Sequence, residues 1–461
     1  MEQAITGSIL IADDQYPYSY DKETEKLTLY IGGKTISVPE DTMSFVGQKY
    51  GVLNGGRFLY KLDLPFSNDC MGFENGQPKY FSLANQVRSV EYYIENYEAG
   101  SRYKEMRLRF PELDYFIPSR GRVTVSEKEI VFSRVKDTFY CFDIKYQDTD
   151  VSVAFEAKMN CNVGPRAVAE TISELVLRFP ETDDLEYLQG IYEVTRSFFV
   201  FVCNRKNIGL RSATLIGEYP TKKIENQKVV DAIGYSKQTV YFSQKYLEPE
   251  EDTAKIKKTI HSNYLAANLP KLFQLFSAET VDGMATVNGS SMHPSIKYRN
   301  LIDLEQSLHI TASFEYYVRT LLPEISSKTT IEFFTELGSL IDEYINRITG
   351  KKKKKAENFR KSLRPQLSLS DKMTKAYKGY TDWRPLKPIL AEWFGEDISD
   401  FADSANLWRN ELAHEKREFI PDEKVIHAVR LVEHMNYCIV LRKAGYDDAQ
   451  IKAIVSEILV R

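Results

Sequence analysis

The sequence lacks several features that define familiar classes of protein. No run of about 18 apolar residues occurs in the 461 residues, so we expect no membrane-spanning helix. The N-terminal segment has no basic residues ahead of a long apolar stretch, so we expect no secretion signal. The cysteines are odd in number and never form a C-x-x-C pair, which argues against disulfide frameworks and zinc knuckles (Cys70, Cys141, Cys161, Cys203 and Cys438). These absences predict a cytoplasmic protein.

Histidines and metal-ligand patterns are also scarce. The chain has six histidines, and none stands in an acidic cluster with metal-ligand spacing. The glycine-rich segment Gly47–Gly56 lacks the G-K-[ST] ending of a phosphate-binding loop. We therefore expect neither a metal nor a cofactor. The formal net charge is −4, so any contact with nucleic acid must come from a local basic patch.

The N-terminal part of the chain has the pattern of β-structure. Apolar and polar residues alternate in runs that include Leu27–Ile31, Thr35–Val38, Arg122–Val125, Ile130–Phe132, Phe139–Tyr146 and Val151–Phe155. This period of two is typical of strands with one buried and one wet face. We predict an antiparallel, sandwich-like domain with packed helices, one of them near residues 86–98.

A helical period begins after Asp183. Apolar residues recur at spacings of three and four from Leu185 to Val202, and Asp183 with Glu186 fits a capping box. The end of this segment is unusually aromatic, and we predict a helix buried against the sheet. Asn204–Asn207 then ends the helix before a short strand, Ala213–Ile216.

The C-terminal part has the pattern of a helical bundle. Four amphipathic stripes begin near Leu301, Phe334, Phe401 and Val425. The predicted fold class is α+β, with a β-rich domain at 1–265, a linker region at 266–300 and an all-α domain at 301–461.

A basic segment interrupts this helical part. Residues 351–378 contain eleven lysines and arginines against two acidic residues. Such a block is typical of a solvated or disordered loop, and the alternative is an electrostatic contact with phosphates. The residues of that alternative RNA-binding patch are Lys351, Lys352, Lys353, Lys354, Lys355, Arg360, Lys361 and Arg364.

The heptad Trp408–His414 carries the candidate chemistry. On a helix, His414 lies about 140° around and about 7.5 Å along from Arg409, while Asn410 is one turn below His414 on the same face. One helix therefore does not direct Arg409 and His414 at one small target. Two copies related by a two-fold axis would place both pairs in one cleft, which predicts a homodimer.

These residue types suit RNA cleavage without a metal. A histidine with a pKa near neutrality can accept the proton of the 2′-hydroxyl or donate one to the leaving 5′-oxygen. An arginine fork can stabilise the negative charge that grows on the phosphate. Asn410 would orient the imidazole or hold a phosphate oxygen, and Glu305 or Glu315 on a preceding helix could position Arg409 through an ion pair. The expected product is a 2′,3′-cyclic phosphate.

The motif formed by Arg409, Asn410 and His414 resembles the R-x(4–6)-H motif of the HEPN superfamily, in which a polar residue often follows the arginine. The segment Leu185–Ile216 after a β-rich region resembles the N-terminal domain of ApeA-like anti-phage defence proteins. These resemblances imply a helical domain that dimerises and cleaves tRNA or another cellular RNA. They also imply an N-terminal domain that senses a phage-derived trigger or restrains the nuclease in abortive infection.

Other interpretations of these residues remain open. The domain could be a non-catalytic HEPN module that binds RNA or protein or mediates dimerisation. Arg409 and His414 could be cations that interact only with a helix macrodipole. His427 and His434 could be surface or interface residues, or could line an RNA cleft with Lys424 and Arg430. The N-terminal domain could add recognition of a carbohydrate or peptide.

Overall fold

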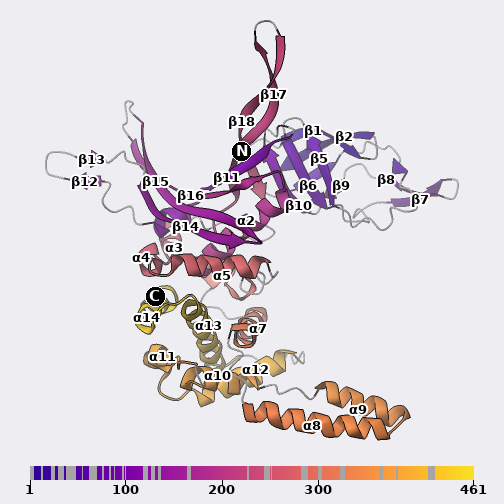
Figure 1. Cartoon of the computed structure of the whole chain (residues 1–461), viewed down its shortest axis with the longest axis vertical. Helices are drawn as coiled ribbons and strands as arrows, with labels where there is room; N and C mark the ends of the chain where they lie inside the picture. The colour runs from indigo at the N-terminus through magenta and orange to yellow at the C-terminus, as the bar shows by residue number, and fades with distance from the viewer. Residues whose placement is uncertain are drawn as a thin grey trace. The chain divides into compact units, whose positions relative to one another are not determined.

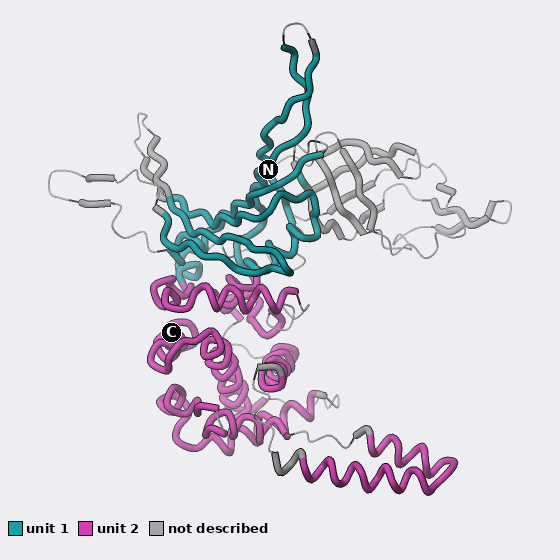
Figure 2. Tube along the Cα trace, in the orientation of Figure 1, with its two compact units in different colours: residues 1–196, 207–257 teal, residues 197–206, 258–461 magenta. Residues whose placement is uncertain are grey.

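Two compact units make up the chain. Unit 1 contains residues 1–196 and 207–257, and unit 2 contains residues 197–206 and 258–461 (Figure 2). The computed structural model describes residues 98, 100–117, 137–162, 168–225, 228–242, 250, 252–281, 289–298, 304–321, 328–362, 367–380, 383–413 and 421–460, and strand segments between 5 and 95 and between 123 and 132.

Six neighbouring strands, called the six-stranded sheet, form part of a larger antiparallel sheet in unit 1. The strands follow the order β14, β15, β16, β11, β17, β18 (Figure 1). Their bounds are Arg102–Leu108 (β11), Asp137–Tyr146 (β14), Thr149–Asn162 (β15), Val168–Thr182 (β16), Ser212–Glu225 (β17) and Lys228–Phe242 (β18). The predicted strands at 139–146 and 151–155 are confirmed, and the predicted strand at 213–216 lies within β17.

One face of this sheet is apolar and lies under two helices. Its fully buried side chains include Leu108, Phe155, Leu175 and Leu215. Helix α1 (Pro111–Phe116) places the ring of Phe116 5.3 Å from that of Phe155. Helix α2 (Leu185–Cys203) places the ring of Tyr192 4.3 Å from that of Phe242. Burial of these rings fixes both helices on the sheet, because each removes a large apolar area from water.

The N-terminal cap of helix α2 lies one residue later than predicted, at Asp184. The carboxylate of Asp184 accepts hydrogen bonds from the backbone N–H groups of Glu186 and Tyr187, at 2.9 and 3.1 Å. Asp184 therefore satisfies the N–H groups at the helix start. The predicted cap at Asp183 is wrong by one position.

The aromatic end of α2 belongs to unit 2. The ring of Phe201 stacks on that of Tyr437 at 4.5 Å, and the ring of Phe198 lies 4.8 Å from that of Phe273. The prediction that the whole helix is buried against the sheet is therefore wrong for its end. The sequence period identified the buried stripe but could not identify the partners, which lie far away in sequence.

Unit 2 is otherwise built from helices. Their bounds are Ser262–Leu265 (α4), Leu269–Val281 (α5), Leu304–Leu321 (α7), Lys328–Arg347 (α8), Gly350–Ser362 (α9), Leu369–Lys378 (α10), Lys387–Phe394 (α11), Ser399–Ala413 (α12), Glu423–Lys443 (α13) and Asp448–Val455 (α14). The four predicted helices correspond to α7, α8, α12 and α13. A bundle of only four helices is wrong, because α9, α10, α11 and α14 join them.

Helix α13 is the central element of unit 2. It packs against α7, α12 and α14, and every residue from Leu431 to Leu441 is buried. Asn436 Nδ2 donates to the backbone oxygen of Ile310 on α7 at 3.1 Å. The Tyr437 hydroxyl donates to the backbone oxygen of Phe201 at 2.7 Å. Apolar burial and these buried hydrogen bonds together fix α7 and the end of α2 on α13.

Helices α8 and α9 pack side by side as a hairpin (Figure 1). Arg360 of α9 makes two hydrogen bonds to the carboxylate of Asp342 on α8, both at 3.0 Å. A Cβ at Gly338 would lie 2.7 Å from the guanidinium carbon of Arg360, so glycine permits this close approach. The lysines at 351–355 lie on α9, and the prediction of a loop there is wrong because lysine itself is a good helix former.

The α+β fold class is confirmed, with an antiparallel N-terminal sheet and a helical C-terminal region. The helix expected near residues 86–98 is wrong, because Ser89–Glu95 forms strand β10. The range 266–300 contains α5, whose side chains Leu272, Phe273 and Phe276 are fully or almost fully buried. The domain bounds drawn from the sequence remain a prediction.

Candidate active site

The end of helix α12 holds the candidate catalytic residues. Ala402, Ala405 and Trp408 recur every three positions and are almost fully buried. This stripe fixes the rotation of the helix, because the large indole of Trp408 is only 1% exposed. Arg409, the next residue, is therefore turned to the edge of the stripe, where its side chain is 39% exposed. An anion in solvent can reach it there.

A carboxylate on another helix holds Arg409. Arg409 Nη2 lies 3.1 Å from Glu315 Oε2 on α7. Lys372 Nζ on α10 lies 2.8 Å from the other oxygen, Glu315 Oε1. The predicted role of Glu315 as an ion-pair partner is confirmed by this distance. Glu305, the other candidate, lies instead 3.5 Å from His309 on its own helix.

Glu315 stays ionised in this cluster. Partial burial by itself raises the pKa of the Glu315 carboxyl, but the hydrogen bond and charge of Lys372 and then those of Arg409 outweigh it. The pKa of Glu315 therefore lies below its ordinary value. A carboxylate shared by two cations restrains the Arg409 guanidinium and leaves further N–H donors for a phosphate.

Asn410 lies beside Arg409 on the exposed side of the helix. Arg409 Nη1 donates to Asn410 Oδ1 at 3.3 Å, so the two candidate residues are in contact. Asn410 thus helps to orient the arginine, an effect that the sequence did not predict. His414 follows the last residue of α12, Ala413, and lies outside the described residues. Its predicted role remains a prediction.

The residues of the predicted RNA-binding patch lie on or after α9. Lys351, Lys352, Lys354 and Lys355 are exposed, and Lys353 is half-buried. Arg360 is engaged with Asp342. The side chain of Lys361 and the whole of Arg364 lie outside the described part of the chain. RNA binding by these residues remains a prediction.

The two histidines of α13 have different surroundings. His434 is 7% exposed, and its ring lies 5.0 Å from that of Phe394. Its burial contradicts both predictions for His434, as a surface or interface residue and as a residue that lines an RNA cleft. His427 is half-exposed and lines a shallow depression of about 380 Å³ with Phe401 and Lys424.

A buried polar cluster near the end of α2 was missed by sequence reasoning. His293 Nε2 lies 3.0 Å from Glu433 Oε1 on α13, and Asn204 Nδ2 donates to the same oxygen at 3.2 Å. Burial raises the pKa of Glu433, but His293 first, then His434 and Asn204, outweigh it and lower that pKa to about 2. No local pattern joins these residues, because the chain brings them together from three distant segments.

Lys372 was also missed as part of the candidate site. It lies 37 positions before Arg409 and on another helix, so no spacing rule connects the two residues.

Within the described residues, no group of three or more His, Cys, Asp or Glu side chains is arranged to hold a metal ion. The same residues contain no helix long and apolar enough to cross a membrane.

Residues 308–450 match the family described as Apea-like HEPN. The matched range includes α8 to α13, Arg409, Asn410 and His414. The chain therefore contains an Apea-like HEPN domain at residues 308–450, from a family of typically metal-independent ribonucleases that bind RNA and dimerise. Comparison with curated proteins gave no match, and comparison with solved structures gave none either.

Proposed function

We propose that this protein is a metal-independent endoribonuclease whose active site contains Arg409, Asn410 and His414. One observation carries the proposal: the motif lies within the matched HEPN domain, and its arginine is held at the edge of α12 by Glu315 while remaining 39% exposed. An arginine that served only packing would not need a restrained and accessible guanidinium.

The proposed reaction is an internal transfer at phosphorus. The 2′-oxygen of the RNA attacks the adjacent phosphorus, and the bond to the 5′-oxygen breaks. One His414 imidazole accepts the 2′-hydroxyl proton or donates a proton to the leaving 5′-oxygen, and the second copy would supply the other step. Arg409 stabilises the charge on the phosphate oxygens, and Asn410 orients Arg409. The products are a 2′,3′-cyclic phosphate and a free 5′-hydroxyl.

Dimerisation through the C-terminal helical domain is part of the proposal. Phe333, Leu340 and Tyr344 lie on one face of α8 and are each more than half exposed. Helix α8 carries four acidic and two basic residues, whereas α9 carries seven basic residues and one acidic residue. A second copy of the chain would therefore cover this apolar face, and the acidic α8 of one copy would attract the basic α9 of the other.

Replacing Leu340 with glutamate tests this dimer. The charge would have to be buried between two copies, so we expect dissociation to a monomer and loss of RNA cleavage. Sedimentation analysis and a cleavage assay on the same samples measure both effects. Val229→Glu, at an exposed apolar residue of unit 1, is the matched control and should remain dimeric and active. An L340E variant that stays dimeric would contradict this interface.

Glu315 is proposed as a positioning residue for Arg409. Replacing Glu315 with glutamine removes the charge that holds the guanidinium and should lower the cleavage rate by roughly tenfold, the scale of a lost charge-assisted hydrogen bond. Because the pKa of Glu315 is already below its ordinary value, the pH dependence of cleavage between pH 5 and 8 should keep its shape. Glu305→Gln on the same helix is the control. A changed pH profile in E315Q would show that Glu315 itself exchanges a proton in the reaction.

We further propose that the nuclease acts in anti-phage defence by abortive infection in the cytoplasm. The support is the Apea-like HEPN match together with a separate β-rich unit that could sense a phage-derived trigger. A nuclease that attacks cellular RNA, including tRNA, must be restrained until infection. Cells carrying the intact gene should survive phage as a population, whereas cells carrying Arg409→Ala should not.

A non-catalytic HEPN module that binds RNA or protein is the alternative. It keeps the same fold and the same basic α9, so binding alone does not distinguish the two functions. An assay for cleavage products, after purified protein is incubated with total RNA, distinguishes the two functions. RNA binding that weakens steeply with salt, with no cleavage product at any protein concentration, would favour the alternative.

A further inference from the structure

The second face of the six-stranded sheet is polar and carries an ordered row of charges. Cross-strand pairing places Arg107 of β11 opposite Thr214 of β17, and Thr214 opposite Thr239 of β18. Two residues further along β17, on the same face, Ile216 is opposite Lys237 of β18. Directly paired residues share a face, so these side chains lie together on the side opposite the buried Leu108 and Leu215.

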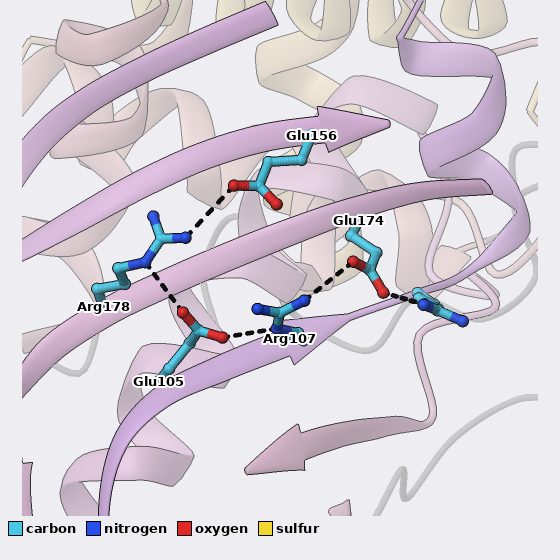
Figure 3. Close-up of polar contacts among 6 residues, drawn as sticks. Glu105, Arg107, Glu156, Glu174 and Arg178 are labelled. Atoms are coloured by element: carbon cyan, nitrogen blue, oxygen red, sulfur yellow. Dashed lines mark hydrogen bonds and ion pairs between the residues drawn. The ribbon is translucent and has the colours of Figure 1, made fainter. Parts of the chain in front are cut away.

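Acidic side chains on this same face hold the arginines in place (Figure 3). Glu174 of β16 is 3% exposed and lies 3.4 Å from Arg107 Nη1, while Arg109 binds the other Glu174 oxygen. Arg107 Nε also lies 2.6 Å from Glu105. The same chain of contacts continues to Arg178, which bridges Glu105 at 2.9 Å and Glu156 at 3.3 Å. Both pocket arginines are thus fixed before any ligand arrives.

A cavity of about 480 Å³ lies in front of these arginines. Its lining carries three cations, Arg107, Arg109 and Lys237, and one carboxylate, Glu174. With Glu105, which binds Arg107 from outside the lining, the group keeps one net positive charge. Three hydroxyl groups, from Ser212, Thr214 and Thr239, complete the polar lining. The volume falls within the range of about 300–1,000 Å³ that is typical of small-molecule sites.

The pocket arginines keep donors for a ligand. A guanidinium has five N–H groups, and the carboxylates of Glu105 and Glu174 use only some of those on Arg107 and Arg109. Lys237 adds a mobile point charge from the neighbouring strand β18. The lining therefore offers planar forks, hydroxyl donors and an excess of positive charge, which match the several oxygens and double negative charge of a phosphate monoester.

We propose that this pocket binds a small molecule through a phosphate group, with Arg107, Arg109 and Lys237 as its cationic contacts. The site lies in unit 1 and does not depend on the proposed ribonuclease, since the groups that form it come from strands β11, β16, β17 and β18 and from Arg109, the residue that follows β11. A phosphorylated ligand there would give the N-terminal unit a chemical signal of its own.

The test is equilibrium binding of the full chain to inorganic phosphate, to AMP and to succinate at constant ionic strength, measured by calorimetry. We expect phosphate and AMP to bind and succinate, a dianion of another shape, to bind at least tenfold more weakly, because the hydroxyls and forks fit a tetrahedral group. Equal affinity for phosphate and AMP would identify the phosphate group as the whole ligand. Tighter binding of AMP would add a nucleoside contact.

Two variants connect the binding to the pocket. Lys237→Ala removes an exposed cation without disturbing Glu174, and should weaken phosphate binding roughly ten- to a hundredfold, as for loss of a charge-assisted hydrogen bond. Thr214→Val, on a different strand, should weaken it without changing charge. Lys222→Ala is the control, because Lys222 lies on the same face of β17 outside the cavity. No phosphate binding by the wild type, equal succinate binding, or an equal loss in K222A would each overturn the proposal.

Discussion

Replacing His414 with alanine is expected to lower the rate of RNA cleavage by about 10²–10⁴-fold, the usual contribution of a general acid or base. Arg409→Ala should lower it by about 10²–10³-fold, because it removes a donor to the charge that develops on phosphate. Both rates are measured under single-turnover conditions with end-labelled RNA. The wild type should remain active in EDTA and leave a 2′,3′-cyclic phosphate, which phosphatase treatment and mass spectrometry identify.

The matched control for these variants is His309→Ala. His309 lies on α7 in the same domain, is 39% exposed and pairs with Glu305. Its replacement should leave cleavage within about twofold of wild type, since surface substitutions away from a site have small effects. Circular dichroism and sedimentation should give the same fold and oligomeric state for all variants. A fully active H414A protein, or inhibition of the wild type by EDTA, would refute the proposed mechanism.

Replacing Glu433 with alanine is expected to destabilise unit 2 by roughly 3–5 kcal/mol, because it leaves the buried partners of a carboxylate unpaired. His293 is 1% exposed and Asn204 is 2% exposed, so neither can recover the contact from water. For a domain of this size, such a loss corresponds to a fall of about 6–20 °C in melting temperature. Calorimetry of the full chain measures the effect.

Glu423→Ala provides the comparison for this loss. Glu423 lies on the same helix with its side chain 92% exposed, so its removal should cost less than about 1 kcal/mol. A similar melting temperature for E433A and E423A would contradict the structural role of the buried cluster.

The buried cluster of Glu433, His293 and Asn204 should also make the stability of unit 2 depend on pH in acid. The pKa of Glu433 is about 2 in the folded state, below its ordinary value of 4.5. Its contribution is therefore fully present above about pH 5 and is lost as the pH falls toward 2. Wild type should lose stability over this window, and E433A should lose less of it. Parallel stability curves for the two proteins would contradict this assignment.

Hydrophobic periodicity predicted those helices that bury a single apolar stripe against one neighbouring part of the fold. Helix α12 follows its predicted stripe, in which Ala405 is fully buried, and the predicted residue Val432 of α13 is fully buried within a helix that is buried on more than one side. The stripe predicted for α7 is wrong: Leu304 is 41% exposed and Ala312 is exposed, whereas Ile310 and Phe314 are fully buried. Helix α10 was missed, although Ser368 and Asp371 form a capping box before a stripe that includes Met373 and Tyr377. That local signal was present and would have found the helix. The lysines of α9 were instead judged by their charge alone.

The candidate site was predictable in its local part only. Arg409 and Asn410 were identified together because they are neighbours in the motif, but their side-chain contact was not predicted, since successive positions on a helix do not face each other. Glu315 was accessible as a hypothesis because an acidic residue on a bundle helix is a natural arginine partner. Lys372 and the Glu433 cluster required the packing of distant helices, which periodicity does not specify. The same limit applies to the phosphate pocket, which depends on strand register across β11, β17 and β18.

Helix α2 has a consequence for how this gene could have been assembled. Its aromatic end and the residues that follow it, together Ser197–Lys206, complete the interior of the helical unit, with Phe201 stacked on Tyr437. A recombination event that joined a new N-terminal module at residue 300 would remove this segment and leave Tyr437 uncovered. Exchange of sensors between such proteins would therefore have to carry over a matching aromatic segment, and successful hybrids should share it even when the rest of their N-terminal sequences differ.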